Sequence, residues 1–239
     1  MTVPGWARLC TTGVVAAAVL ALSLGLSGCV STVAGVASRD PDEPRWEPML
    51  IEADLDGLLL GVDDLNDIVG SSDLQVSFDS STLNDNSEAV SDRDCLAAAF
   101  GAQELVYQDS GWTAVRDQIV REPGEGNPHW IEQVVVLHST AEQAQAFVKH
   151  SQAIWEGCAG TIVTFDSEDM PQIWSVSDVT ADDSSISQMS TPEDSPSGGC
   201  HHVLSAASNV VVEAWVCGDD IDQQATEVVR EIVAHVRSK

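Results

Sequence analysis

Thiols offer the clearest chemistry in this sequence of 239 residues, which contains, beyond its apolar start, Cys95, Cys158, Cys200 and Cys217. An even number of cysteines in an exported chain predicts two disulfides, and four cysteines allow three pairings. Residues 200–217 have the pattern of two β runs about a turn at 208–209, so opposed positions sum to 417, as 207 and 210 do. Cys200 and Cys217 satisfy that sum and are expected to face each other across the hairpin. Cys95 is then left to pair with Cys158.

Another cysteine, Cys29, ends an apolar stretch near the start of the chain. One basic residue, Arg8, precedes an apolar run from Val14 to Leu26 and then two small residues, which is typical of a secretory signal. The run has thirteen residues, fewer than the roughly 20 of a membrane-spanning helix. The ending L-S-G-C is similar to the bacterial lipobox, whose thiol receives a diacylglycerol. We predict that residues 1–28 are a lipoprotein signal peptide and that Cys29 carries the lipid. The alternative is an uncleaved anchor helix reaching Val36.

Acidic residues outnumber basic ones by 38 to 10, which gives a formal net charge of −28 at pH 7. A chain of this charge repels nucleic acid and anionic membrane surfaces, so neither is expected as a partner. Residues 29–49 contain three prolines and no hydrophobic period, and they are predicted to be a lipidated tether. Residues 50–239 are then one domain, expected to be a monomer held at the outer face of the cell membrane by the Cys29 lipid.

Helices are predicted where apolar residues recur at three and four positions. The longer ones span residues 54–69, 140–158 and 222–236. Gly70 is placed to end the first, and Ser139 with Glu142 forms a capping box for the second. A shorter helix carries Cys95. The second long helix has an inward stripe of Ala144, Phe147, Val148, Ser151, Ile154, Trp155 and Cys158.

Strands are predicted where β-forming residues alternate between short turns. Besides the hairpin of residues 200–217, they span residues 74–78, 112–119, 131–138, 161–165, 173–179 and 185–189, with loops at 79–89 and 190–199. Helices bracket the strands rather than alternating with them. The fold class is therefore expected to be α+β, with helices packed on one face of an antiparallel sheet.

Four blocks of the sequence become specific when they are taken together and in order. They are S-D-R-D-C, V-Y-Q-D-S-G-W-T-A-V-R-D-Q, the segment from E-Q-V-V-V-L-H to A-I-W-E-G-C, and the hairpin C-H-H-V-L-S-A-A-S-N-V-V-V-E-A-W-V-C. Across residues 50–236 the chain resembles the extracellular sensor domain of the mycobacterial PknH-type receptor serine/threonine kinases, a domain that also occurs on lipoproteins. The resemblance implies an α+β fold with two disulfides and a large cleft for an unidentified ligand, and the four cysteines fall at the family's positions. It departs at His202, where the family commonly has an arginine. No Gly-rich phosphate loop, H-R-D or D-F-G of a kinase occurs.

Aromatic and hydrogen-bonding residues suited to a ligand cleft gather in two places. Trp112 and Arg116 share one face of a predicted strand with Tyr107 nearby, and His202 stands opposite Trp215 on the hairpin. These five residues are the predicted ligand-binding set, although each Trp is also suited to a core.

Catalytic, metal and cofactor sites are not expected. The sequence has no G-x-S-x-G, and adjacent strand residues such as His201 and His202 point to opposite faces, where they cannot readily share a metal. The sequence thus predicts a non-catalytic, ligand-binding surface lipoprotein for a small molecule or envelope ligand. A lipoprotein that docks on an envelope protein is the alternative, and a hydrolase ranks third.

Overall fold

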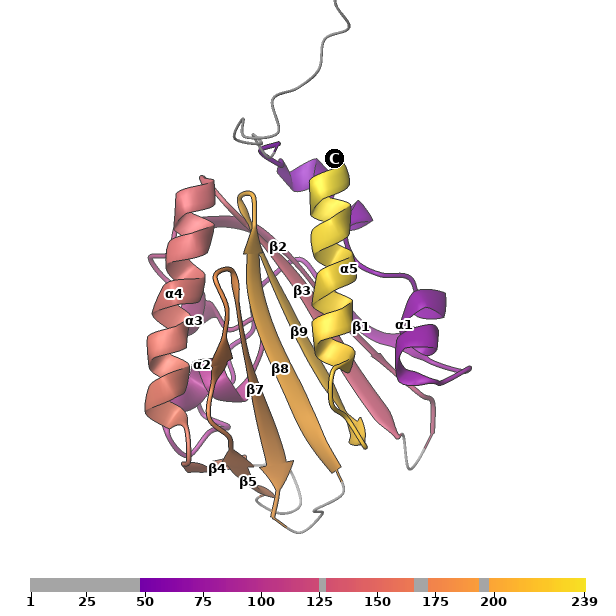
Figure 1. The fold of residues 1–239 in the computed structure, drawn as a ribbon, viewed down its shortest axis with the longest axis vertical. Helices are drawn as coiled ribbons and strands as arrows, with labels where there is room; N and C mark the ends of the chain where they lie inside the picture. The colour runs from indigo at the N-terminus through magenta and orange to yellow at the C-terminus, as the bar shows by residue number, and fades with distance from the viewer. Residues whose placement is uncertain (1–47, 125–127, 166–171, 194–197) are drawn as a thin grey trace, which may run out of the picture. The chain divides into compact units, whose positions relative to one another are not determined.

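The structure, a computed structural model, describes residues 48–124, 128–165, 172–193 and 198–239. The predicted signal peptide, Cys29 and nearly all of the tether lie outside the described residues. Within the described part, the strands form one antiparallel sheet of order β1-β2-β3-β9-β8-β7-β5-β4, with β6 paired to β7 (Figure 1). The strands are β1 (Gln75–Ser80), β2 (Trp112–Arg121), β3 (His129–His138), β4 (Ile162–Phe165), β5 (Gln172–Val176), β6 (Thr180–Ala181), β7 (Ser185–Pro192), β8 (Gly198–Ala207) and β9 (Val210–Asp219).

The central hairpin has the predicted register. Cys200 pairs with Cys217 and His202 with Trp215, and every other pair along β8 and β9 keeps the same sum. The turn places Ser208 at a φ of 51°. The predicted loop at 190–199 is shorter than expected, because β7 continues to Pro192 and β8 already begins at Gly198. Residues 194–197 lie outside the described part.

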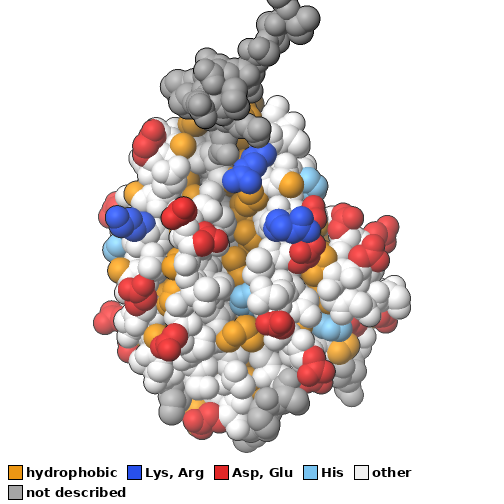
Figure 2. Space-filling view, in the orientation of Figure 1, with side chains coloured by type: hydrophobic (Ala, Val, Ile, Leu, Met, Phe, Trp, Pro, Cys, Tyr) orange, Lys and Arg blue, Asp and Glu red, His pale blue; other side chains and the backbone are white. Residues whose placement is uncertain are grey.

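Helices cover both faces of the sheet, so the expectation of helices on one face was wrong. One face carries η1 (Glu52–Gly57), α1 (Val62–Val69) and α5 (Gln224–Ser238), and the other carries η2 (Arg93–Cys95), α2 (Leu96–Ala99), α3 (Glu104–Tyr107) and α4 (Ala141–Cys158). The reason lies in the strands, because β9 carries apolar side chains on both of its faces. Val210 and Val212 pack into the α5 side and Val211 into the α4 side. The outer surface is rich in acidic side chains (Figure 2).

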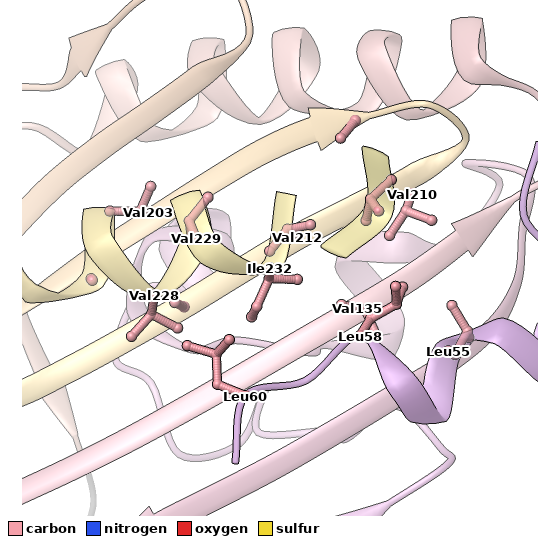
Figure 3. Packing of buried hydrophobic residues seen from close by; sticks show 14 of the residues in the cluster. Leu55, Leu58, Leu60, Val135, Val203, Val210, Val212, Val228, Val229 and Ile232 are labelled. Atoms are coloured by element: carbon pink, nitrogen blue, oxygen red, sulfur yellow. The ribbon is translucent and has the colours of Figure 1, made fainter. Parts of the chain in front are cut away.

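The α5 side is a core of aliphatic residues. Val228, Val229 and Ile232 of α5 lie against valines of β8 and β9, and Leu55, Leu58 and Leu60 close the cluster from the N-terminal segment (Figure 3). Burying each such side chain contributes about 1.5–3 kcal/mol. This layer supports the back of the sheet and leaves the α4 side to form the candidate site.

The helix expected over residues 54–69 is broken in two. The backbone N–H of Leu60 donates to Gln133 Oε1 at 2.9 Å, and Gln133 Nε2 donates to the Leu60 carbonyl at 3.0 Å. The buried amide of Gln133 thus satisfies backbone groups that a continuous helix would have used. The predicted end of α1 is confirmed, because Gly70 adopts the left-handed conformation with φ 73°.

The helix α4 has the predicted inward stripe but a different cap. Its buried residues are Ala144, Phe147, Val148, Ser151, Trp155 and Cys158. The cap is Thr140, whose side chain accepts a hydrogen bond from the N–H of Gln143 at 3.2 Å. The cap therefore lies one residue later than the expected box of Ser139 and Glu142. Ser139 directly follows the end of β3, and its backbone N–H donates to the Gly111 carbonyl just before β2.

Candidate functional site

A groove of 1060 Å³ runs between α4 and the segment of residues 92–110. Its lining is mainly apolar and comes from Leu96, Ala97, Leu105, Val106, Ala146, Phe147, Ala153 and Ile154. Polar side chains stand among these, including Asp92, Asp94, Asp109, Gln143 and His150. An apolar hollow with a few polar groups is the usual form of a small-molecule site.

A disulfide joins the two walls of this groove. Cys95 at the end of η2 is bonded to Cys158 at the end of α4, with 5.7 Å between their Cα atoms, and both residues line the groove. The second disulfide joins Cys200 to Cys217 across the hairpin, with Cα atoms 4.0 Å apart. Both predicted pairings are confirmed. The first one fixes the separation of α4 from the opposite wall.

Glu213 of β9 ties that opposite wall to the sheet. Its Oε2 atom accepts hydrogen bonds from the Ala102 N–H and the Tyr107 hydroxyl, each at 3.2 Å. Its Oε1 atom lies 2.8 Å from Nε2 of His202. A carboxylate can only accept, so Nε2 carries the proton of that bond. Three donors from two layers of the fold therefore meet on one buried side chain.

His202 lies between two tryptophan rings. Its ring centroid is 4.1 Å from that of Trp155 on α4 and 4.1 Å from that of Trp215 on β9. Burial lowers the pKa of His202, which opposes the effect of its Glu213 partner. Within the described part, His202 Nδ1 and Trp215 Nε1 are buried without a hydrogen-bond partner.

Two further carboxyl groups are buried on the same face of the sheet. Asp117 of β2 accepts a hydrogen bond from Asn84 Nδ2 at 2.8 Å, and burial together with the charge of Glu213 raises its pKa to about 6. Burial raises the pKa of Glu132 on β3 well above its ordinary value, and the charges of Asp117 and Glu213 raise it further. Burial also raises the pKa of Tyr107, which keeps its hydroxyl a donor. The groove thus lies above a layer of buried acids whose charges raise the pKa of their neighbours.

A thin layer of side chains separates this polar layer from the groove. Ala97, Val106 and Phe147 line both the groove and a small void of 10 Å³ that also touches Tyr107 and Glu213. The ring of Phe147 stacks on Tyr107 with centroids 4.2 Å apart. A molecule seated in the groove would therefore contact residues that rest directly on the Glu213 cluster.

The model of the family described as PknH-like extracellular domain matches residues 50–235. The chain belongs to this family. The serine/threonine-protein kinases PknH of Mycobacterium bovis and Mycobacterium tuberculosis are each 34% identical to it over 224 residues, which is 94% of this chain and 37% and 35% of theirs. The chain thus spans about a third of the length of these curated relatives. The crystal structure of the extracellular domain of PknH from Mycobacterium tuberculosis matches with 32% identity and a TM-score of 0.76, covering 81% of this chain and all of that one.

The family match and the crystal structure confirm the predicted family and the α+β class, and the structure of this chain contains both predicted disulfides. The similarity is to the extracellular domain of a serine/threonine-protein kinase, a non-catalytic domain. No helix in the described ranges is both long and apolar enough to cross a membrane.

The PknH-like domain brings three of the five predicted ligand residues together. Tyr107, His202 and Trp215 gather at Glu213, where each is at most 5% exposed. They form a buried cluster under the groove, and only Tyr107 reaches the small void beneath it. Among the described lining residues of the groove, none of the five predicted residues is present.

The other two predicted residues, Trp112 and Arg116, lie on opposite faces of β2. The pairing of β2 with β3 shifts between Trp112 and Ala114, so strict alternation fails there. Trp112 packs on the α4 side, whereas the Arg116 guanidinium pairs with Asp56 of η1 on the other side. Their expected common face was therefore wrong.

Sequence reasoning missed the three buried acids. Each is an isolated acidic residue in the interior of a strand. Glu213 directly follows V-V-V, and Glu132 stands between Ile131 and Gln133, one residue before V-V-V-L. A charged residue in such a place is a signal for a buried polar cluster, since an unpaired buried charge is strongly unfavourable.

Proposed function

We propose that this protein is a lipid-anchored extracytoplasmic protein whose PknH-like domain binds a small ligand in the α4 groove without catalysis. The observation that carries the proposal is the groove itself, whose 1060 Å³ is comparable to the upper range of ligand pockets, about 1,000 Å³. Its apolar floor supplies the surface that a ligand would bury, and its polar rim supplies groups that would orient it.

The construction of the groove supports binding by a preorganised surface. The Cys95–Cys158 disulfide holds the walls together at the end of α4. The hydrogen bonds of Glu213 hold the α3 wall on the sheet through Ala102 and Tyr107. A wall that is fixed before binding loses little conformational freedom when a ligand arrives, which favours affinity.

The anchor and the biological role are also proposals. The L-S-G-C ending and the short apolar run support lipidation at Cys29. The chain resembles only the extracellular third of its kinase relatives. A surface domain of this kind would tune or compete for the ligand of a related kinase sensor.

Native mass spectrometry of residues 30–239 tests the proposal directly. The core residues of the described part run from Leu50 to Val236, so this chain keeps the whole folded unit. The protein is expressed in an oxidising compartment of the cells that export it. A reproducible added mass, lost when Ala153 in the groove is replaced by Trp, is expected. A bare chain that stays bare with extracts of the same envelope would overturn small-molecule binding.

A second candidate function is docking on an envelope protein, which the exposed edge strand β1 favours. Val76 and Phe78 of β1 are 46% and 38% exposed, and β1 ends the sheet order. An open edge with apolar side chains can accept a strand from a partner. Crosslinking from Ser77→Cys to a single envelope protein would support this function, and β1 crosslinks spread over many proteins would reject it.

A further inference from the structure

The charges around the α4 groove are unevenly distributed. Three carboxylates, those of Asp92, Asp94 and Asp109, line it, and all three residues are exposed. The arginine of the lining, Arg93, already pairs with Glu88. The other ionisable side chain among the described lining residues is His150. An anionic head group would therefore meet three acids and one cation that is already engaged.

The floor between these acids suits a slender apolar body. Ala146, Ala153 and Gly157 present small exposed positions on α4, with Phe147 and Ile154 set deeper. Leu105 on the facing wall is 50% exposed and adds apolar surface to the groove. Burial of this surface would hold the apolar body of a ligand.

We propose that the ligand of this groove is a small cationic amphiphile, with an apolar body along α4 and a positively charged head at the acidic rim. This inference rests on the proposed function and names the class of its ligand. The overall charge of −28 acts in the same direction, because it raises the local concentration of cations and repels anions. Acidic side chains far outnumber basic ones on the face seen in Figure 2.

The position of Lys149 supports the same choice. Lys149 precedes His150 on α4 but lines a different hollow, together with Asp182 and Asp183. The helix therefore turns its ammonium group away from the groove. A phosphate or carboxylate ligand would find no ammonium group among the described lining residues.

Three fluorescent probes with one fluorophore test the charge of the ligand. Dansylcadaverine carries a cation, dansylamide is neutral and dansylglycine carries an anion at pH 7. Each is titrated into residues 30–239 at low salt, with emission of the fluorophore as the measurement. We expect dansylcadaverine to bind about tenfold more tightly than dansylglycine, and the ratio to fall towards one at high salt because exposed charges are screened.

Matched variants locate the effect. Asp92→Asn with Asp109→Asn removes two charges from the rim while keeping the η2 cap, because an Asn oxygen can accept the bond that Asp92 now receives from the Asp94 N–H. Asp63→Asn with Asp67→Asn removes two charges from exposed positions of α1 on the other face of the sheet. Only the first pair should reduce the preference for dansylcadaverine, to about threefold or less, with dansylamide binding unchanged.

The outcomes separate this inference from the proposed function. If dansylglycine binds as tightly as dansylcadaverine, and both are blocked by Ala153→Trp, the groove binds ligands but the cationic class is wrong. If both rim and control variants lower the preference equally, the acids of the rim do not recognise the head group and the inference fails. If no probe binds saturably, the groove is not a binding site for this class of molecule and the proposed function fails as well. The same holds if Ala153→Trp in the groove leaves probe binding as unchanged as the control Gln145→Trp, which lies outside the groove.

Discussion

The hydroxyl of Tyr107 on α3 donates a hydrogen bond to the carboxylate of Glu213 on β9 over 3.2 Å, although 106 positions separate the two residues in the chain. Both side chains are buried, and Glu213 also receives the Ala102 N–H and the ring N–H of His202. This contact links the wall of the groove to the centre of the sheet. Its loss should therefore affect stability and binding together.

Replacing Glu213 by Gln should destabilise the domain by about 2–3 kcal/mol, because the amide keeps only one acceptor oxygen and its NH₂ group would face either His202 or the donors of Ala102 and Tyr107. Tyr107→Phe should cost about 1–2 kcal/mol, since Glu213 keeps its other two donors. Urea unfolding monitored by tryptophan fluorescence measures both. Glu104→Gln on the exposed side of α3 is the control and should lie within about 0.5 kcal/mol of the wild type. An unchanged midpoint for Glu213→Gln would show that the cluster does not hold the wall.

Asp117 should make folding depend on pH. Its folded pKa of about 6 lies above the ordinary 3.8, so folding takes up a proton. The stability from this group is fully present below about pH 4 and is lost as the pH rises through 6, on the order of 3 kcal/mol in total. The buried His201 and His202 act in the opposite direction, because burial lowers the pKa of each, that of His201 to about 4.

The variant Asp117→Asn removes that contribution, since its amide oxygen can still accept the Asn84 hydrogen bond and both histidines remain. It also removes the Asp117 charge that raises the pKa of Glu132, so the acid layer as a whole takes up fewer protons on folding. Unfolding free energies of wild type and variant are compared at pH 4.5 and pH 7.5. The variant should gain relative to the wild type as the pH rises. A constant difference between the two proteins would mean that Asp117 does not change its protonation in this interval.

The two disulfides should differ in what they support. Removing Cys95–Cys158 by two alanine substitutions opens a loop with a sequence separation of 63 residues, and removing Cys200–Cys217 opens one of 17. The chain-entropy model gives losses of roughly 4 and roughly 3 kcal/mol. Only the first variant should also lose dansylamide binding, because only that bond joins the walls of the groove. Equal binding by both variants would argue that the hydrogen bonds of Glu213 are sufficient to hold the wall.

The central hairpin and α4 could be predicted because local rules decide them. The turn at 208–209 fixes the pairing of β8 with β9, and hence the partners of Cys200 and His202. The 3.6-residue period decides which residues of α4 face inward. No long-range contact had to be known in either case.

Contacts between distant segments explain what sequence reasoning missed. The break after η1 depends on Gln133, 73 positions from Leu60. The two faces of β2 depend on a shift in its pairing with β3. The groove lies between segments that the sequence keeps about 50 positions apart, so its lining could not be derived from either segment alone. The buried acids lie close together because β2, β3 and β9 are neighbours in the sheet, and the sequence alone does not give this strand order.

Replacing Cys29 by Ala should abolish anchoring if the lipoprotein prediction is right. The thiol is the only group at which the diacylglycerol would be attached, so the variant should be misprocessed or released from the membrane. Membrane fractionation with metabolic labelling by a palmitate analogue measures both. Cys10→Ala, within the same predicted signal peptide, is the matched control and should remain labelled and membrane-bound. The anchor helix would be favoured if the Cys29 variant stayed fully in the membrane with its signal uncleaved and the wild type also took up no palmitate label.

Gly101 should be intolerant of even a methyl group, because it lies against the buried acid layer. A Cβ atom at this position would stand 2.5 Å from Oε2 and 3.0 Å from Cδ of Glu132, which is itself buried. Gly101→Ala should therefore destabilise the domain by about 1–3 kcal/mol, the usual effect of overpacking a well-packed interior. Gly157→Ala on α4 is the counterpart, since its Cβ would meet nothing within 4 Å, and it should stabilise the helix by about 0.5–1 kcal/mol. Thermal unfolding of the two variants should move in opposite directions, and a stable Gly101→Ala would mean that Glu132 is free to turn away from the layer.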